Sequence, residues 1–189
     1  MEQLGAGDAL LLVDVQHDFL PGGALAVPQG DRVLAPLSRA VAAFAGQGLP
    51  IFASRDWHPS NHCSFHAQGG PWPPHCVAGT RGAEFALTLP PSAIVISKAT
   101  RPEEEAYSAF AGTELEQTLR EAGVRRLFVG GLATDYCVRA TVRDALAAGF
   151  EVVLLTDAVA AVDSEGGARA LEEMRRLGAR LIDAASAFE

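Results

Sequence analysis

The chain has 189 residues, of which 49% are apolar and 20% charged, a composition typical of a globular protein with a substantial core. Its formal net charge of -8 argues against a nucleic acid or an anionic membrane as a partner. No apolar run approaches the length of a membrane span, and no signal peptide precedes Asp8. Three cysteines at irregular spacing do not form a disulfide framework, so we expect free thiols and a cytoplasmic protein.

The first third of the chain contains two apolar runs and one helical pattern. The run at 9–13 predicts a strand that is buried on both faces and ends at Asp14. Apolar residues at helical spacing predict a helix over 32–46, and a second strand follows at 50–54. The segment 55–91 then lacks periodicity but holds four of the five histidines and both tryptophans. A loop of this length in a compact domain usually carries function.

The rest of the chain alternates strands and helices. A strand at 93–97 leads to Lys98, and Thr113 with Glu116 forms a capping-box pattern at the start of a helix. The remaining elements are strands at 126–129, 151–155 and 179–182, and helices from Cys137 to about 149 and from Ser164, as its cap, to 177. This alternation predicts a single α/β domain over 1–189, with a mainly parallel six-stranded sheet in three layers and helices on both faces.

Cys137 follows a strand and the pair Gly130-Gly131, which we interpret as a tight turn into a helix. A cysteine in the first turn of a helix lies among free backbone N–H groups at the positive end of the helix dipole. Both effects favour the thiolate, and the same N–H groups can hold an oxyanion. The pattern therefore predicts a nucleophilic cysteine.

Asp14, Lys98 and Cys137 each follow a predicted strand. Parallel strands end at the same edge of a sheet, so we expect the three side chains to cluster there. In such a cluster Asp14 can take the thiol proton and return it to a leaving amine, while Lys98 stabilises the thiolate. Each residue alone also fits a structural role, as a turn aspartate, a solvated lysine or an inert buried thiol. Their coincidence at three strand ends favours catalysis.

Asp56, His58 and His75 form a second predicted group within the 55–91 segment. Asp56 and His58 are two residues apart in an extended stretch, so both side chains can point to one side. Two histidines and one carboxylate suit zinc, with iron(II) and manganese as alternatives. His62 is a weaker candidate, and surface histidines without a metal are the structural alternative. A zinc knot that includes the nearby cysteines is disfavoured because no CxxC pair is present.

Aromatic residues accompany both groups. Phe19, Trp57, Trp72 and Tyr107 lie in predicted loops close to the polar residues in sequence. A single loop aromatic is often a local core plug. Four of them beside a nucleophile and a metal group predict the walls of a pocket for a flat ring.

These residues together resemble the nicotinamidase/pyrazinamidase family, within the isochorismatase-like cysteine hydrolases. The matching stretches are Val13-Asp-Val-Gln-His-Asp-Phe19, Arg55-Asp-Trp-His-Pro59 with His62-Cys-Ser-Phe65, Trp72-Pro-Pro-His-Cys-Val-Ala-Gly79, Lys98 with Ala106-Tyr-Ser-Ala-Phe110, and Gly130-Gly-Leu-Ala-Thr-Asp-Tyr-Cys-Val138. They cover most of the chain in order. Two departures, His17 where the family often has Asn and Ala99 where it often has Gly, touch no proposed catalytic atom.

The resemblance implies a metal-dependent hydrolase that converts nicotinamide to nicotinic acid and ammonia through a thioester, acts on pyrazinamide as well, and serves NAD salvage. The implied catalytic residues are Asp14, Lys98 and Cys137, the metal ligands Asp56, His58 and His75, with His62 as a further candidate, and the pocket residues Phe19, Trp72 and Tyr107. It also implies a cis peptide between Leu132 and Ala133, which directs the N–H groups of Ala133 and Cys137 at the oxyanion.

Two other functions stay open at this point. One is a cysteine amidohydrolase of the same superfamily that acts on a carbamoyl or ureido compound. The metal segment argues against it, because such a substrate offers no ring nitrogen to coordinate. The other is a non-catalytic metal-binding domain, which intact Asp14, Lys98 and Cys137 disfavour. The sequence does not indicate whether the protein is a monomer or a homo-oligomer.

Overall fold

A single parallel sheet forms the centre of the computed structural model, which describes residues 2–188. Its strands are β1 (Asp8–Val13), β2 (Ile51–Asp56), β3 (Ile94–Lys98), β4 (Arg126–Leu132), β5 (Glu151–Ala160) and β6 (Arg180–Ile182). They lie in the order β3-β2-β1-β4-β5-β6, and every neighbouring pair is parallel. The predicted α/β class and six-stranded sheet are confirmed.

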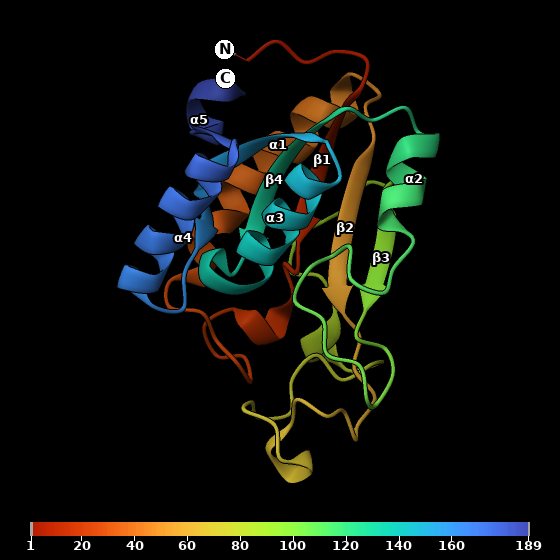
Figure 1. Cartoon of the computed structure of the whole chain (residues 1–189), viewed down its shortest axis with the longest axis vertical. Helices are drawn as coiled ribbons and strands as arrows, with labels where there is room; N and C mark the ends of the chain where they lie inside the picture. Colours follow the sequence, from red (N-terminus) through yellow and green to blue (C-terminus); the bar gives the residue numbers. More distant parts are fainter. Residues whose placement is uncertain (1, 189) are drawn as a thin grey trace.

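Helices cover both faces of this sheet (Figure 1). They are α1 (Leu34–Gly46), α2 (Leu115–Glu121), α3 (Arg139–Ala147), α4 (Ser164–Leu177) and α5 (Ala184–Ala187). Short 3-10 turns occur at η1 (His17–Phe19), η2 (Gly30–Val33), η3 (His66–Gln68) and η4 (Arg81–Ala83), and a wider π turn, η5 (Thr134–Val138), precedes α3. No helix within residues 2–188 has the length and apolar character needed to cross a bilayer.

The alternation of side chains along β1 divides the core into two layers. Leu10 and Leu12 join the cluster that packs against α1 and α5, which includes Phe44. Leu11 and Val13 join the opposite cluster, to which α2, α3 and α4 contribute. All four β1 side chains are at most 1% exposed, so this strand is buried on both faces, as its continuous apolar run predicted.

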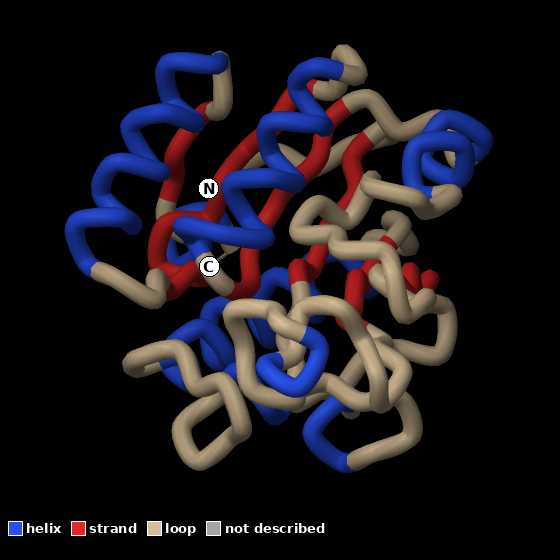
Figure 2. Tube along the Cα trace, turned by 60° about the horizontal axis from the view of Figure 1, so that its bottom comes forward, coloured by secondary structure: helices blue, strands red, loops and turns tan. Residues whose placement is uncertain are grey.

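The order of the strands reverses between β1 and β4. The chain proceeds from β1 through β2 to β3 on one side and from β4 through β5 to β6 on the other. Loops that follow adjacent strands diverge at such a point and leave a crevice at the carboxyl ends. The long segment after β2 lies below these strand ends in Figure 1, opposite both termini, and the loops gather there in Figure 2.

The interpretation of Gly130-Gly131 as a turn is wrong, because both glycines lie within β4. A Cβ on Gly131 would stand 2.1 Å from the backbone oxygen of Val13, and its φ is +131°. A Cβ on Gly130 would stand 2.7 Å from the side chain of Leu37. The pair is therefore required for close packing of β4 on β1 and α1, and the turn comes after it.

Two helix starts also differ from the sequence patterns. Asp163, rather than Ser164, caps α4, since its carboxylate accepts a hydrogen bond of 2.6 Å from the N–H of Gly166. The Thr113 hydroxyl accepts a bond of 3.3 Å from Leu115 N–H, but Glu116 pairs with Arg120 instead of completing a capping box. The sequence pattern thus located these helices correctly but not their caps.

Candidate active site

Asp14, Lys98 and Cys137 lie together at the carboxyl edge of the sheet, as their positions after strands predicted. The Lys98 ammonium is 2.9 Å from Asp14 Oδ2 and 3.7 Å from Cys137 Sγ. Ser54 Oγ donates a hydrogen bond of 2.6 Å to Asp14 Oδ1. Asp14 and Ser54 are fully buried, and Lys98 and Cys137 are nearly so. The cluster is shielded from water, and charge interactions are strong in such a low-dielectric interior.

Lys98 is the central cation of this cluster. Besides Asp14 it contacts Asp56 Oδ1 at 2.5 Å and donates to the carbonyl of Ala106 at 3.1 Å. Burial alone would lower the pKa of Lys98, but the carboxylates of Asp14 and Asp56 outweigh it and raise that pKa well above its usual value. Lys98 is therefore charged throughout the physiological range and neutralises part of the negative charge around it.

The surroundings of Cys137 favour the thiol over the thiolate, in contrast to the expectation from the helix dipole. Cys137 lies in the π turn η5 rather than in the first turn of an α-helix. Burial raises the pKa of the thiol well above its usual value, although Lys98 opposes this shift. The nucleophile consequently needs a base to activate it.

Asp14 has the properties of that base. Burial raises the pKa of its carboxyl group, against the opposing effect of Lys98. Its Oδ2 is buried and accepts no well-aligned hydrogen bond, although the Lys98 ammonium is 2.9 Å away. A carboxylate with a raised pKa and an unused lone pair is suited to taking a proton from the neighbouring thiol.

Asp56, His58 and His75 form a second buried group beside this cluster. One donor atom from each lies within 4.8 Å of the others. The Nε2 atoms of His58 and His75 are 3.4 and 3.9 Å from Asp56 Oδ2. Lys98 and His58 hold the pKa of Asp56 well below its usual range despite its burial, so it is ionised.

The tautomers of the two histidines also fit a metal. His58 Nδ1 donates to the carbonyl of Ala99 at 3.0 Å, and His75 Nδ1 donates to that of Pro73 at 2.8 Å. Because a carbonyl oxygen only accepts, each Nδ1 carries a proton, and each Nε2 lies on the side of Asp56 as the nitrogen available to a metal. A carbonyl partner on the far nitrogen is the usual arrangement for metal-binding histidines, so these residues fit a divalent metal.

His62 lies outside this group. Its Nδ1 is 2.7 Å from Ser64 Oγ and its Nε2 is 2.6 Å from the carbonyl of Glu104. Its ring stacks on that of His58, with centroids 4.1 Å apart. Both ring nitrogens of His62 thus contact other groups in this geometry, and its role as a further ligand stays a prediction. The His62 ring instead packs against the face of the His58 ring.

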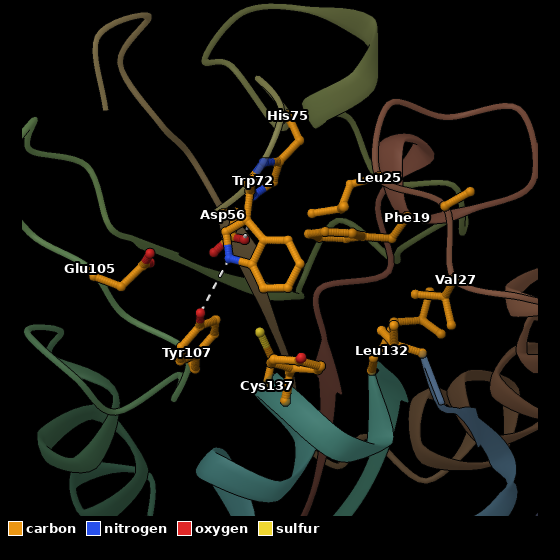
Figure 3. A pocket seen from close by; sticks show the side chains of 14 residues that line it. Phe19, Leu25, Val27, Asp56, Trp72, His75, Glu105, Tyr107, Leu132 and Cys137 are labelled. Atoms are coloured by element: carbon orange, nitrogen blue, oxygen red, sulfur yellow. Dashed lines mark hydrogen bonds and ion pairs between the residues drawn. The ribbon is translucent and has the colours of Figure 1, made fainter. Parts of the chain in front are cut away.

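One pocket joins the two groups (Figure 3). Its lining includes Phe19, Trp72 and Tyr107, as predicted, together with Asp56, His75, Ala133 and Cys137. Trp72 Nε1 donates a hydrogen bond of 3.2 Å to the Tyr107 hydroxyl, which fixes two of the walls. The Cys137 sulfur points into the space that these aromatic residues enclose. Trp57 does not line it, because its ring lies under the guanidinium of Arg55 at 3.6 Å.

The structure adds pocket residues that the sequence did not indicate. They are Leu25, Ala26, Val27, Glu105, Leu132, Tyr136 and Val162. Tyr136 packs edge-on against Trp72, with ring centroids 5.5 Å apart, and its position next to Cys137 was a usable signal. The 25–27 loop and Val162 reach the pocket only through the tertiary fold, so no local pattern could have identified them.

The peptide between Leu132 and Ala133 is cis, as predicted from the family resemblance. Ala133 follows β4 and lines the pocket together with Cys137. The Ala133 carbonyl accepts hydrogen bonds of 3.1 Å from the N–H groups of Tyr136 and Val138. These bonds tie Ala133 to the turn that carries the thiol.

Comparisons with known proteins point to the same chemistry. Residues 8–186 match the isochorismatase domain family. Escherichia coli nicotinamidase is 40% identical, over 92% of this chain and 93% of its own length. Pyrococcus horikoshii pyrazinamidase, solved in complex with zinc, is 52% identical with a TM-score of 0.93, covering 94% of this chain and 99% of its own. PnC1 from L. infantum, solved with nicotinate, is 39% identical with a TM-score of 0.90, covering 99% and 97%.

Proposed function

This chain belongs to the isochorismatase family, and on that basis we propose that it is a metal-dependent nicotinamidase that hydrolyses nicotinamide to nicotinic acid and ammonia. One observation carries the proposal beyond family membership. Asp56 and His75 of the ligand group line the same pocket as Cys137, so a ring nitrogen and a carboxamide can be held at once. The zinc-bound and nicotinate-bound relatives support it. The whole chain acts as one catalytic domain.

The first half of the reaction forms a covalent intermediate. Asp14 Oδ2 takes the proton of the Cys137 thiol, and Lys98 stabilises the resulting thiolate across 3.7 Å. The sulfur attacks the carboxamide carbon, and the carbonyl oxygen becomes an oxyanion that the N–H groups of Ala133 and Cys137 stabilise. Asp14 then passes its proton to the amide nitrogen, the C–N bond breaks and ammonia leaves. The product of this half is a thioester between Cys137 and the acyl group.

The second half regenerates the thiol. Asp14 takes a proton from a water molecule as the water oxygen attacks the thioester carbon. The same N–H groups hold the second oxyanion, the C–S bond breaks, and Cys137 recovers a proton from Asp14. Nicotinic acid is then released. Asp14 thus acts in both halves as base and then as acid.

The substrate ring is positioned by the other walls of the pocket. A divalent metal held by Asp56, His58 and His75, with zinc as the first choice and iron(II) or manganese as alternatives, would supply a Lewis-acid contact to the pyridine nitrogen. Phe19, Trp72 and Tyr107 enclose the faces and edge of the ring. Pyrazinamide carries a nitrogen at the same place relative to its carboxamide, so we propose that it is a second substrate.

Hydrolysis of a carbamoyl or ureido compound is less well supported. Such a substrate has no ring nitrogen to use the buried ligand group and no ring to fill the aromatic walls. We also place the enzyme in a reducing cytoplasm, since its three cysteines are all free and its mechanism needs a reduced thiol. Its proposed role there is NAD salvage.

The test is ammonia release from nicotinamide by the purified protein before and after treatment with a chelator. We expect activity to fall by at least about 100-fold on chelation and to return when zinc is added back. N-carbamoylsarcosine and other ureido compounds provide the comparison. Turnover of these compounds in preference to nicotinamide would overturn the assignment, and activity that survives complete metal removal would overturn the role of the metal.

A further inference from the structure

Gln16 makes a set of contacts that the proposed reaction does not use. Its side chain is fully buried and forms three hydrogen bonds with backbone groups of two distant segments. The amide nitrogen donates to the carbonyls of Asp56 at 2.8 Å and Ala83 at 2.9 Å, and the amide oxygen accepts from Asp56 N–H at 2.9 Å. We propose that Gln16 is a positioning residue that fixes Asp56 and thereby sets the affinity of the metal site. This inference rests on the metal site of the proposed function.

The need for Gln16 arises where β1 ends. Backbone pairing of β1 with β2 extends to Val13 opposite Ser54, and Asp14 N–H makes a further bond of 3.1 Å to the Ser54 carbonyl. Asp14 then has a φ of +50°, which turns the main chain away from β2 and leaves its carboxylate in the active site. Asp56, two residues farther along β2, therefore has no backbone partner on the β1 side.

The side chain of Gln16 fills this gap. Its amide has the same donor and acceptor groups as a peptide, and it bonds to both the N–H and the carbonyl of Asp56, as a neighbouring strand would. On its other side Asp56 pairs with Lys98 of β3. Asp56 is thus held from both sides, with Gln16 completing the sheet at the one position where the catalytic base requires β1 to turn away.

The third hydrogen bond fixes the far end of the long metal-binding segment. Ala83 ends η4, and Gln16 forms an isolated antiparallel bridge with Phe85. Gln16 therefore connects the segment's first metal ligand to the place where the segment returns to the sheet. His58 and His75 both lie between these points in the chain, so their distances from Asp56 depend on the same Gln16 hydrogen bonds.

Loss of the Gln16 hydrogen bonds should lower the metal affinity of the site directly. Removing a partner that orients a metal ligand typically lowers metal affinity about 10- to 100-fold. The Gln16→Leu substitution keeps a side chain of similar volume but leaves two carbonyls and one N–H buried without partners. Gln16→Glu keeps the acceptor for Asp56 N–H and loses both donors. Gln16→Glu also turns a carboxyl oxygen toward both carbonyls in a buried site, so zinc affinity should fall in this variant as well.

Ser54→Ala is the matched control. Ser54 is equally buried, lies on β2 two residues before Asp56 and makes one side-chain hydrogen bond across the strands, to Asp14 rather than Asp56. A loss of general stability at this end of β2 would affect both variants. A loss confined to the metal ligand affects only the Gln16 variants.

The experiment measures the zinc dissociation constant of the metal-free full-length protein by competition with a colorimetric chelator, with circular dichroism to verify folding. We expect zinc affinity to fall about 10- to 100-fold in both Gln16→Leu and Gln16→Glu, and less than about twofold in Ser54→Ala. Should Gln16→Leu fail to fold, Gln16→Glu alone decides the question by the same criterion.

Two results would overturn the inference. One is zinc binding by the Gln16 variants that matches the unsubstituted protein, and the other is an equal loss in Ser54→Ala. Failure of the unsubstituted protein to bind zinc would instead refute the metal site of the proposed function, so the two failures are distinguishable.

Discussion

Asp56 divides its carboxylate oxygens between two groups. Oδ1 contacts Lys98 at 2.5 Å, and Oδ2 faces His58 and His75 at 3.4 and 3.9 Å. A single side chain therefore joins Lys98 to the two histidines of the proposed metal site. This double contact places the ring-binding and carboxamide-binding ends of the pocket at a fixed separation.

Ser54 should control the pH at which Asp14 becomes a base. Turnover requires ionised Asp14, so kcat/KM should fall as the pH drops through the pKa of that carboxyl, which burial raises above its usual value. The hydrogen bond from Ser54 stabilises the ionised form, and its loss in Ser54→Ala raises the pKa further. We expect the acidic inflection of kcat/KM to move up by about one pH unit, as judged from full pH profiles. An inflection that stays in place or moves down would contradict this role.

His75 and His62 should differ in their effect on the metal. His75 offers Nε2 to the ligand group, whereas both nitrogens of His62 are bonded elsewhere. His75→Asn should therefore lower zinc affinity by more than about 100-fold, the largest loss expected when a residue outside the ligand shell is removed. His62→Asn should leave bound zinc near one ion per chain at saturation. Elemental analysis and chelator titration of both variants provide the measurement. Loss of zinc from the His62 variant at saturation would show that it is a ligand after all.

The sequence predicted the site residues that directly follow strands and missed those that reach the site only through tertiary packing. Asp14 and Lys98 follow apolar runs, so parallel-strand geometry places them together. The raised pKa of Cys137 was not predictable, because it follows from burial in the tertiary fold, which outweighs the helix dipole. Glu105 enters the pocket through loop geometry that no local pattern encodes, whereas Tyr136 was indicated only by its position next to Cys137.

Gly131 should be one of the least replaceable residues of the sheet. In Gly131→Ala the new Cβ would meet the Val13 backbone at 2.1 Å, and the φ of +131° disfavours any side chain. Because backbone atoms of a central strand cannot move aside, we expect a loss of about 3 kcal/mol or more in the free energy of unfolding. Chemical denaturation checks it. Gly46→Ala, in α1 with open space around it, is the control and should be neutral or slightly stabilising. Similar values for the two substitutions would contradict the packing argument.

Elements were predicted well where a period governs them and less well at their ends. The apolar runs located β1 and β5, but β5 continues through Thr156 and Asp157 to Ala160, and β2 continues through Arg55 to Asp56. Both extensions begin with polar residues, which interrupt the apolar run although the backbone stays paired with a neighbouring strand. The short helix α5 lies at the end of the chain and carried no signal of its own.

The position of the site follows from one topological feature of the whole molecule, the reversal of strand order in the sheet. Because strand order reverses between β1 and β4, the ends of β1, β2, β3 and β4 bring Asp14, Asp56, Lys98 and the turn of Cys137 to one crevice. Alternation of strands and helices predicted a parallel sheet, but it could not supply the order of the strands. That order follows from which pairs bury their apolar faces best, a property of the complete fold.

The most direct test of the proposed function compares ammonia release from nicotinamide by the unsubstituted protein and by Cys137→Ala, both loaded with zinc to equal content. We expect the unsubstituted protein to release ammonia and nicotinic acid, and Cys137→Ala to lose at least about 10⁴-fold in kcat while it retains its zinc, since the nucleophile lies outside the metal group. Turnover of nicotinamide by Cys137→Ala at the unsubstituted rate, or no ammonia release by the unsubstituted protein, would contradict a cysteine nicotinamidase.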